Sequence, residues 1–464
     1  MGSPDYSNQF VEKMRSAGIH AAAIRAFQHH YQELRGGETG LIPEESIHAV
    51  DSLPTLDRVS QGVDLSLLER TAILKLNGGL GTGMGLDQPK SLLPIRGALT
   101  FLDFIVRQIQ KLRRDSGAQI SFLLMNSFST SFATRQYLQR YPDLGAAESY
   151  ELMQSKVPKV DAHTLAPADW PAQPELEWCP PGHGDLYASL QGSGWLDRLL
   201  SHGVIYLFVS NSDNLGATLD LGLLHYFANS GLSFLMEVAA RAEADRKGGH
   251  LARRADGRLI LREAAQCPAG DQTSFQDIEK HRFFNTNNAW LRLDRLKQLL
   301  EAHHNVIPLP LIRNEKPIDP RDANSRRVFQ LETALGSAIE CFSDSGAVVV
   351  PRSRFAPVKT TAELLGVRSD AYVEIDGCKL ELASACEGRP PVIQMDPKHY
   401  RTVDQLDANF VVVPSLRRCQ ELIVQGPVRF PDPVEFRGAV RVINDNTAPL
   451  PLPAGIYENT TVRL

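Results

Sequence analysis

A glycine-rich loop that follows a short apolar run constrains this chain more than any other stretch. Residues 71–74 (TAIL) read as a buried strand, and five glycines stand within the eight residues from Gly78 to Gly85. Glycine tolerates positive φ angles, so this backbone can turn several N–H groups toward one point. Such a concavity at the end of a strand binds anions, above all phosphate. Lys90 follows and can place a compact positive charge beside a bound phosphate.

Two familiar phosphate motifs do not fit this loop. The dinucleotide fingerprint G-x-G-x-x-G fails because the sixth position, counted from Gly79 or Gly81, is Met84 or Leu86. The Walker pattern requires glycine directly before Lys-Ser, where this chain has Pro89. A surface turn without a ligand is the alternative, but so many glycines would weaken a merely structural element. The loop therefore predicts a phosphate site of another kind.

Length and composition indicate a soluble globular protein of two or three domains. The chain has 464 residues, of which 43% are hydrophobic and 22% charged. A net charge of −5 argues against nucleic acid as a partner. No apolar run approaches the roughly 18 residues of a membrane span, and the N-terminus lacks the apolar core of a signal peptide. Six scattered cysteines without a C-x-x-C pair favour reduced thiols and a cytoplasmic protein.

The pattern along the chain divides it into three parts. Apolar residues at helical spacing over 7–35 predict one amphipathic helix, within an N-terminal helical segment of residues 1–55. Alternating strands and helices over 56–370 predict a parallel sheet covered on both faces. Short alternating runs over 371–464 predict a separate β-rich domain. The predicted strands are 119–126, 204–209 and 233–238, and the predicted helices are 100–117 and 129–140, one from Ala289 and one over 329–342.

Three polar segments could carry chemistry. Residues 180–185 (PPGHGD) expose His183 between two glycines, although a lone histidine is more often structural. Residues 210–214 (SNSDN) follow a predicted strand, where ligands bind in open α/β sheets. Asp213 is therefore placed to hold a divalent cation such as Mg²⁺, with an Asx-turn or helix cap as the alternative. Residues 285–288 (NTNN) offer clustered amides suited to sugar hydroxyls, and a helix cap would account for only one of them.

These segments together resemble the UTP–glucose-1-phosphate uridylyltransferase (UDP-glucose pyrophosphorylase) family. The resemblance rests on separated motifs between about residues 70 and 370: LNGGLGTGMG with PKS, QSK at 154–156, PPGHGD, NTNN, QLET at 330–333 and RFAPVKTT at 354–361. The family more often has threonine at position 83, Gly-Pro-Lys at 88–90 and isoleucine at 329. The glycines and Lys90 remain in place.

The resemblance implies both a fold and a reaction. The implied fold is α/β, with a Rossmann-like mixed, mainly parallel sheet of the GT-A-like nucleotidyltransferase type and a C-terminal left-handed β-helix domain. Some members use that domain for oligomer contacts, so homo-oligomers can form through it. The implied reaction is Mg²⁺-dependent and reversible: UTP and glucose-1-phosphate give UDP-glucose and pyrophosphate by direct in-line attack of the sugar phosphate.

The resemblance also implies roles for individual residues. The nucleotide-binding residues are Leu76, Asn77, Gly78, Gly79, Lys90, Gln154, Gly182, Asn211 and Asp213. The sugar-phosphate-binding residues are His183, Asn287, Asn288 and Lys359. Lys359 and Lys90 are the implied catalytic residues, and Asp213 is the implied metal ligand. From residue type alone Lys359 would be read as solvated charge, so its assignment depends on the RFAPVKTT match.

The chemistry of the substrates fits residues that carry charge rather than a general base. A sugar phosphate monoester is mostly dianionic near pH 7 and is already nucleophilic. The obstacle is repulsion between two anions, so catalysis consists mainly of positioning and charge neutralisation. The alternatives are a broad-specificity UDP-sugar pyrophosphorylase, an N-acetylhexosamine-1-phosphate enzyme, a non-catalytic nucleotide-sugar-binding protein and a nicotinamide-dependent dehydrogenase.

Overall fold

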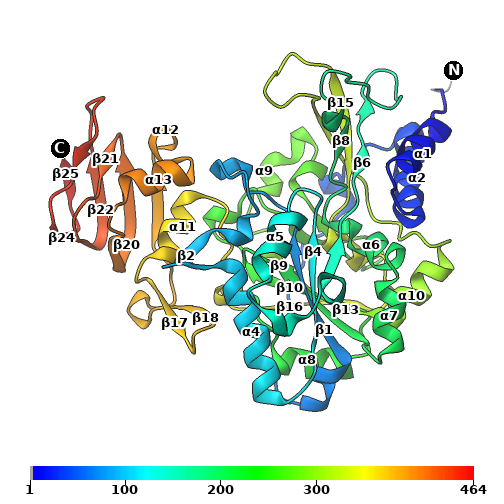
Figure 1. Ribbon diagram of the computed structural model, residues 1–464, viewed down its shortest axis with the longest axis horizontal. Coiled ribbons are helices and arrows are strands. Elements are labelled where there is room, and N and C mark those ends of the chain that lie inside the picture. The colour runs from blue at the N-terminus through cyan, green and yellow to red at the C-terminus, as the bar shows by residue number, and fades with distance from the viewer. Residues whose placement is uncertain (1–3) are drawn as a thin grey trace.

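The computed structural model describes residues 4–464, so the first three residues of the predicted N-terminal segment lie outside the described part. Its centre is a nine-stranded mixed sheet (Figure 1). The main path is β12 (Leu259–Arg262), β11 (His250–Arg253), β13 (Phe283–Arg292), β9 (Tyr206–Asn211), β1 (Thr71–Asn77), β4 (Ser121–Asn126) and β5 (Glu151–Met153). β10 (Phe234–Ala240) pairs with β13 and with β16 (Ser345–Val349).

The pairings confirm the predicted mixed, mainly parallel α/β sheet. β1 pairs in parallel with β4 and β9, β4 with β5, and β10 with β16. The antiparallel pairs involve β13 with β9, β10 and β11, and β11 with β12. Consequently β13 and β12 run against the common direction of the other strands in this sheet.

Both faces of the sheet are covered, as the strand–helix alternation predicts. Within β1, Ile73 packs into one hydrophobic cluster and Leu74 into another, because successive side chains of a strand point to opposite faces. Helices α4 (Phe101–Ser116) and α8 (Leu221–Asn229) contribute to the first cluster. Helices α6 (Leu186–Gly192), α7 (Trp195–Ser201) and α10 (Leu293–Ala302) contribute to the second.

The start of α4 confirms the capping signal read from the sequence. The hydroxyl of Thr100 accepts a hydrogen bond from the backbone N–H of Asp103, and the Asp103 carboxylate accepts one from the backbone N–H of Thr100. The helix ends at Gly117, which has φ +72°. The predicted helix at 129–140 is α5 (Ser131–Leu138).

The single N-terminal helix predicted over 7–35 is wrong. The chain forms α1 (Ser7–Ser16) and α2 (Ala21–Arg35), separated by a turn in which Gly18 has φ +72°. The His20 side chain accepts a hydrogen bond from the Ala23 N–H and so caps the second helix. Phe10 of α1 packs on Phe27 of α2, with ring centroids 5.0 Å apart. Folding the segment back on itself buries both aromatic residues, which one straight helix could not do.

Two further predicted helices differ from the structure. The helix predicted from Ala289 is present as α10 but begins only at Leu293, because residues 289–292 still belong to β13: Ala289 and Leu291 pack into one core and Trp290 into the other. Residues 329–342 form β15 (Arg327–Glu332) and a short 3₁₀ helix, Leu335–Glu340. β15 pairs with β14 (Ile312–Pro317), a long-range contact that local sequence does not reveal.

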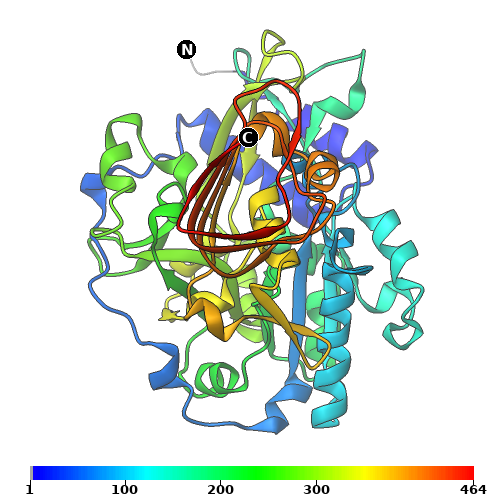
Figure 2. The same ribbon diagram turned by 90° about the vertical axis from the view of Figure 1, so that its left-hand side faces the viewer.

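The C-terminal region is a stack of short parallel strands, which agrees with its predicted β-rich character (Figure 2). β20 (Ser415–Gln425) lies between β19 (Val392–Met395) and β22 (Val434–Ile443), and β22 also pairs with β24 (Gly455–Glu458) and β25 (Thr461–Arg463). Two short helices, α12 (Pro397–Tyr400) and α13 (Val403–Asn409), form the connection along the chain from β19 to β20. Across residues 4–464, no helix has the length and apolar character needed to span a bilayer.

A buried lysine lies in the middle of the sheet. Lys75 of β1 is 2% exposed, and its Nζ donates to Ser210 Oγ and to the Ala217 carbonyl, both at 2.7 Å. Burial, together with the charge of Arg354, lowers the pKa of Lys75 to about 7, and Glu237 acts in the opposite direction. A lysine at this position therefore makes stability depend on pH.

We expect Lys75→Met to remove an upward slope in stability above about pH 7. The unfolded chain keeps this proton up to its ordinary pKa of 10.5, whereas the folded chain releases it from about 7. The free energy of unfolding of the wild type should therefore rise with pH in this window, by at most about 1.4 kcal/mol per pH unit relative to the variant. Urea unfolding of both proteins across this window measures the difference. Parallel pH profiles would contradict the prediction.

Candidate functional site

The glycine loop leaves β1 and closes on itself before Lys90. Gly81 and Gly85 both have φ +75°, and the backbone N–H of Lys90 donates to the Gly79 carbonyl at 3.2 Å. A Cβ on Gly85 would lie 2.8 Å from the Thr402 side chain, whereas a Cβ on Gly79 or Gly83 would meet no atom within 4 Å. The loop is thus packed where it touches the protein and open along part of its length, as a cradle for a ligand requires.

Lys90 and Asp213 come together across the ends of two neighbouring strands. Their Nζ and Oδ2 atoms lie 2.5 Å apart, and both side chains are about 15% exposed. Asp213 follows β9, whose last residue Asn211 lies in register with Leu76 of β1. The structure therefore brings these four predicted residues to the carboxyl edge of the sheet.

Gln154 joins the glycine loop to the PPGHGD segment. Its Nε2 donates to the Gly182 carbonyl at 2.9 Å, and a Cβ on Gly78 would lie 2.6 Å from its Oε1. Three residues predicted to bind the nucleotide are therefore in contact.

Asn77, by contrast, has a buried side chain that is already occupied. It donates to Asn126 at 2.7 Å and to Thr134 at 3.1 Å, and it accepts from Ser212 at 3.0 Å. Only its backbone remains for a ligand. Among the predicted site residues, Asn77 and Asn288 are the two that the structure buries.

His183 is held as a neutral imidazole. Its Nδ1 accepts the Leu335 N–H at 2.7 Å, which leaves the proton on Nε2, and burial lowers its pKa to about 4. Gly182 has φ +79°, and a Cβ there would lie 2.3 Å from the Thr333 carbonyl. The QLET segment ending at Thr333 therefore shapes the PPGHGD turn.

The amide cluster lies beside the Asp213 loop because of how β13 pairs. β13 pairs with β9 at Ala289–Val209 and onward to Arg292–Tyr206, so its first half extends past the carboxyl end of β9. The register with β10 shifts between Glu237 and Val238, so Thr286 and Asn287 form a β-bulge in β13. Asn287 has φ +59° and is partly exposed, whereas Asn288 is buried and donates to Glu237 at 3.1 Å.

Lys359 lies on an exposed turn that is anchored to the Asp213 segment. Asn214 donates to the Arg354 carbonyl at 3.0 Å and accepts the Ala356 N–H at 3.1 Å. The Lys359 Nζ lies 6.0 Å from the centroid of the Phe355 ring. Thus the residue next to the predicted metal ligand fixes the turn that carries the predicted catalytic lysine.

Sequence reasoning missed a carboxyl group in this region, that of Glu263. Burial raises its pKa, while a hydrogen bond with the Asn285 side chain and the charge of Lys359 lower it. The Glu263 carboxyl therefore interacts electrostatically with both the amide cluster and Lys359. Glu263 directly follows β12, at the edge of the sheet. It lies outside every motif recognised in the sequence.

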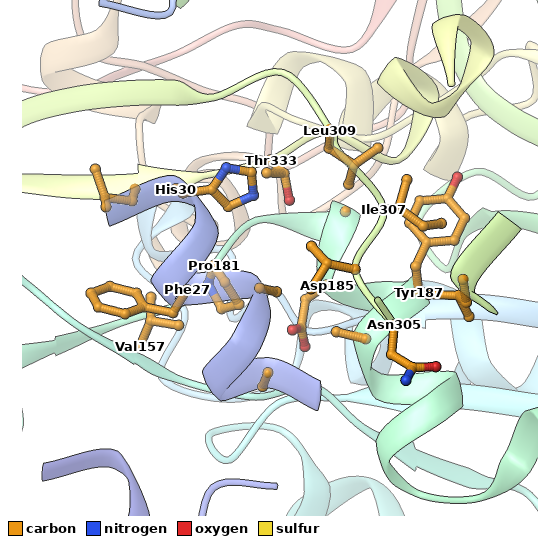
Figure 3. A pocket seen from close by; sticks show the side chains of 17 residues that line it. Phe27, His30, Val157, Pro181, Asp185, Tyr187, Asn305, Ile307, Leu309 and Thr333 are labelled. Atoms are coloured by element: carbon orange, nitrogen blue, oxygen red, sulfur yellow. The ribbon is translucent and has the colours of Figure 1, made fainter. Parts of the chain in front are cut away.

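A separate cavity lies behind the PPGHGD segment, between α2 and α6 (Figure 3). Its wall includes Phe27, His30, Tyr187 and Asp185. Burial raises the pKa of Asp185 to about 7, although the Ser189 hydroxyl and the Ser155 N–H both donate to its Oδ2 at 2.7 Å. None of the predicted nucleotide, sugar-phosphate or metal residues lines this cavity.

Comparison with known proteins indicates one family for this chain. The family model described as UTP--glucose-1-phosphate uridylyltransferase matches residues 20–437. Relatives of that name from Hordeum vulgare and Saccharomyces cerevisiae are each 39% identical, over 86% and 87% of this chain and 82% and 80% of their own.

Solved structures of similar proteins have closely similar folds. A mutant UDP-glucose pyrophosphorylase from Leishmania major in complex with UDP-glucose is 45% identical and has a TM-score of 0.95, covering 99% of this chain and 100% of its own. A protein from Trypanosoma brucei named UDP-glucose phosphorylase is 46% identical, with a TM-score of 0.92 and 99% of both chains covered.

Proposed function

The chain belongs to the UTP–glucose-1-phosphate uridylyltransferase family, and from this premise we propose that it makes UDP-glucose and pyrophosphate from UTP and glucose-1-phosphate, reversibly. One observation carries the proposal in this chain. The open glycine loop, the Lys90–Asp213 pair and the Lys359 turn meet at the carboxyl edge of one sheet. Such a concentration of cations and backbone amides is what two mutually repelling phosphates need.

The nucleotide lies along the glycine loop. Backbone amides of the loop from Gly78 to Gly85 cradle the triphosphate, and Gln154 and the Gly182 turn receive the uracil. Lys90 neutralises the β and γ oxygens. Asn211 of β9 lies in register with Leu76 of β1, so it forms part of the same nucleotide-binding surface.

Asp213 suits Mg²⁺ because that ion takes one or two carboxylates and fills its shell with phosphate oxygens and water. The Asp213 carboxylate lies at a strand end beside the proposed triphosphate position, and its Lys90 partner can turn to the phosphates. When bound, Mg²⁺ would offset the negative charge that develops on the leaving pyrophosphate.

The chemical step requires no general base. A glucose-1-phosphate oxygen attacks the α-phosphorus of UTP, a new P–O bond forms, and the bond to pyrophosphate breaks with the electron pair leaving on pyrophosphate. Lys359 supplies positive charge to the incoming phosphate, and neutral His183 donates a hydrogen bond from Nε2. Asn287 binds sugar hydroxyls directly, and buried Asn288 holds its bulge in place.

The assay for this proposal is pyrophosphate release. Pyrophosphate should form from UTP only when glucose-1-phosphate and Mg²⁺ are both present, in equal amount to UDP-glucose. Equal kcat/KM with galactose-1-phosphate would indicate a broad-specificity UDP-sugar pyrophosphorylase instead. Binding of UDP-glucose without turnover would indicate a non-catalytic binding protein and would overturn the proposal.

The C-terminal stack and the cellular location complete the proposal. We infer that the parallel strands from β19 to β25 form a left-handed β-helix, and that homo-oligomers form through this part of the chain. Sedimentation velocity of the full chain and of Ile456→Glu, which places a charge at an exposed position of this region, tests whether homo-oligomers form there. The six free cysteines support work in a reducing compartment such as the cytoplasm.

A further inference from the structure

A buried carboxylate lies beneath the proposed sugar-phosphate site. Glu237 of β10 is 0% exposed and accepts four hydrogen bonds from three side chains. Arg354 donates Nε to one oxygen and Nη2 to the other, both at 2.8 Å. Trp290 Nε1 donates at 2.9 Å and Asn288 Nδ2 at 3.1 Å. The carboxylate is thus fully satisfied, as a buried charge must be.

The partners of Glu237 belong to segments that the proposed reaction needs. Arg354 begins the turn that presents Lys359, and Asn288 anchors the bulge that exposes Asn287. The carbonyl of Arg354 in addition accepts hydrogen bonds from Asn214, at 3.0 Å, and from Asn288, at 3.4 Å. One carboxylate therefore joins the lysine turn to the amide cluster, and through Asn214 to the Asp213 segment.

Glu237 is also the nearer of the two carboxylates that face Arg354, since Asp220 lies 4.0 Å from the guanidinium. Arg354 is 7% exposed. Burial and the charge of Arg354 lower the pKa of Lys75, and the charge of Glu237 raises it. A buried cation that loses its partner is strongly unfavourable, so the guanidinium would move if the carboxylate were neutralised. Such a movement would carry the Lys359 turn with it.

We propose that Glu237 is a positioning residue that holds the Lys359 turn and the Asn287–Asn288 bulge at a fixed separation, and so sets the sugar-phosphate half of the site. This inference rests on the function proposed above. Glu237 touches no substrate, and its effect passes through Arg354 and Asn288. Within the described residues, the glycine loop and Gln154, which form the side of the nucleotide half away from Asp213, make no hydrogen bond to Glu237.

The test compares Glu237→Gln and Arg354→Lys with the wild type in the full chain. Glutamine keeps the shape of the glutamate side chain, but its amide N–H groups face the donors of Arg354, Trp290 and Asn288. Lysine cannot donate to both carboxylate oxygens of Glu237 as the Arg354 guanidinium does. Each variant should raise KM for glucose-1-phosphate and Kd for UDP-glucose by at least about 10-fold, the loss expected for a charged hydrogen bond. Kd for UDP and KM for UTP should stay within about 2-fold.

The two substitutions should also be coupled. Because they break the same contact, the double variant should lose less than the product of the two single losses. Asp103→Asn is the matched control, since Asp103 is a buried carboxylate that accepts from Tyr137 and Tyr141 at 2.6 Å without contacting a predicted site residue. It should lower Tm and leave the ratio of UDP to UDP-glucose affinity unchanged.

Several outcomes would overturn the inference. Unchanged sugar-phosphate parameters in both variants would do so, as would a parallel loss of UDP affinity, which indicates general damage. If Glu237→Gln does not fold, Arg354→Lys decides alone. Failure of the proposed function is a different result, because the wild type would then release no pyrophosphate.

Discussion

Replacing Lys359 by alanine is expected to lower kcat/KM for UDP-glucose formation by about 10²–10³-fold, the range found when one transition-state donor is removed. The structure leaves this amine exposed on a turn, and within residues 4–464 no carboxylate lies at ion-pair distance from its Nζ. Its charge is therefore available to the phosphate of the incoming sugar. KM for UTP should change little, because the proposed nucleotide position lies against the glycine loop.

Steady-state kinetics with each substrate varied in turn measures this effect. Lys359→Arg keeps the charge but not its compact shape, so it should recover only part of the activity. Lys398→Ala removes another exposed lysine, outside the site, and should behave as the wild type. If Lys359→Ala retained more than about a tenth of kcat/KM, the lost stabilisation would be under about 1.4 kcal/mol. Lys359 would then no longer count as catalytic.

Asp213→Asn is expected to lower kcat/KM by at least about 10²-fold and to raise the Mg²⁺ concentration needed for half-maximal activity. The substitution removes the negative charge that would hold the ion and leaves Lys90 without its partner at 2.5 Å. Titration of activity with Mg²⁺ at fixed UTP measures both changes. Lys90→Ala should lose a comparable amount of activity but keep the Mg²⁺ midpoint, since it removes phosphate contacts rather than the ligand.

The control for Asp213 is a second lysine–aspartate pair. Asp197 and Lys297 lie 2.7 Å apart on exposed helical surfaces, so Asp197→Asn loses an equivalent ion pair of little energetic value. Its Mg²⁺ titration should match that of the wild type. An unshifted Mg²⁺ midpoint in Asp213→Asn would contradict the assignment of Asp213 as metal ligand.

Local signals made much of the sheet and of the glycine loop predictable. The run before the loop is β1, and Thr100 with Asp103 caps α4, because strand hydrophobicity and capping chemistry act within a few residues. The prediction failed where distant partners decide the structure. The helix predicted from Ala289 starts only at Leu293, because cores on both faces of the sheet hold residues 289–292 as the end of β13.

The same limit applies to the site. The glycines, Lys90, Asp213 and Lys359 lie in short motifs, so the sequence could indicate each of them; their roles remain predictions. Glu237 and Glu263 carry no motif, and their importance comes from contacts made across the sheet. The spatial link from Asn214 to the Lys359 turn likewise joins residues more than a hundred positions apart.

The contact between Gly85 and Thr402 has a consequence for the smallest chain that could work. The side chain that fills the space beside this glycine comes from the cap of α13, far beyond the last motif of the catalytic region. A chain truncated after residue 370 would keep every proposed catalytic group yet lose one wall of the proposed phosphate cradle. Minimal versions of this enzyme should therefore retain the C-terminal strands and helices as part of the active unit.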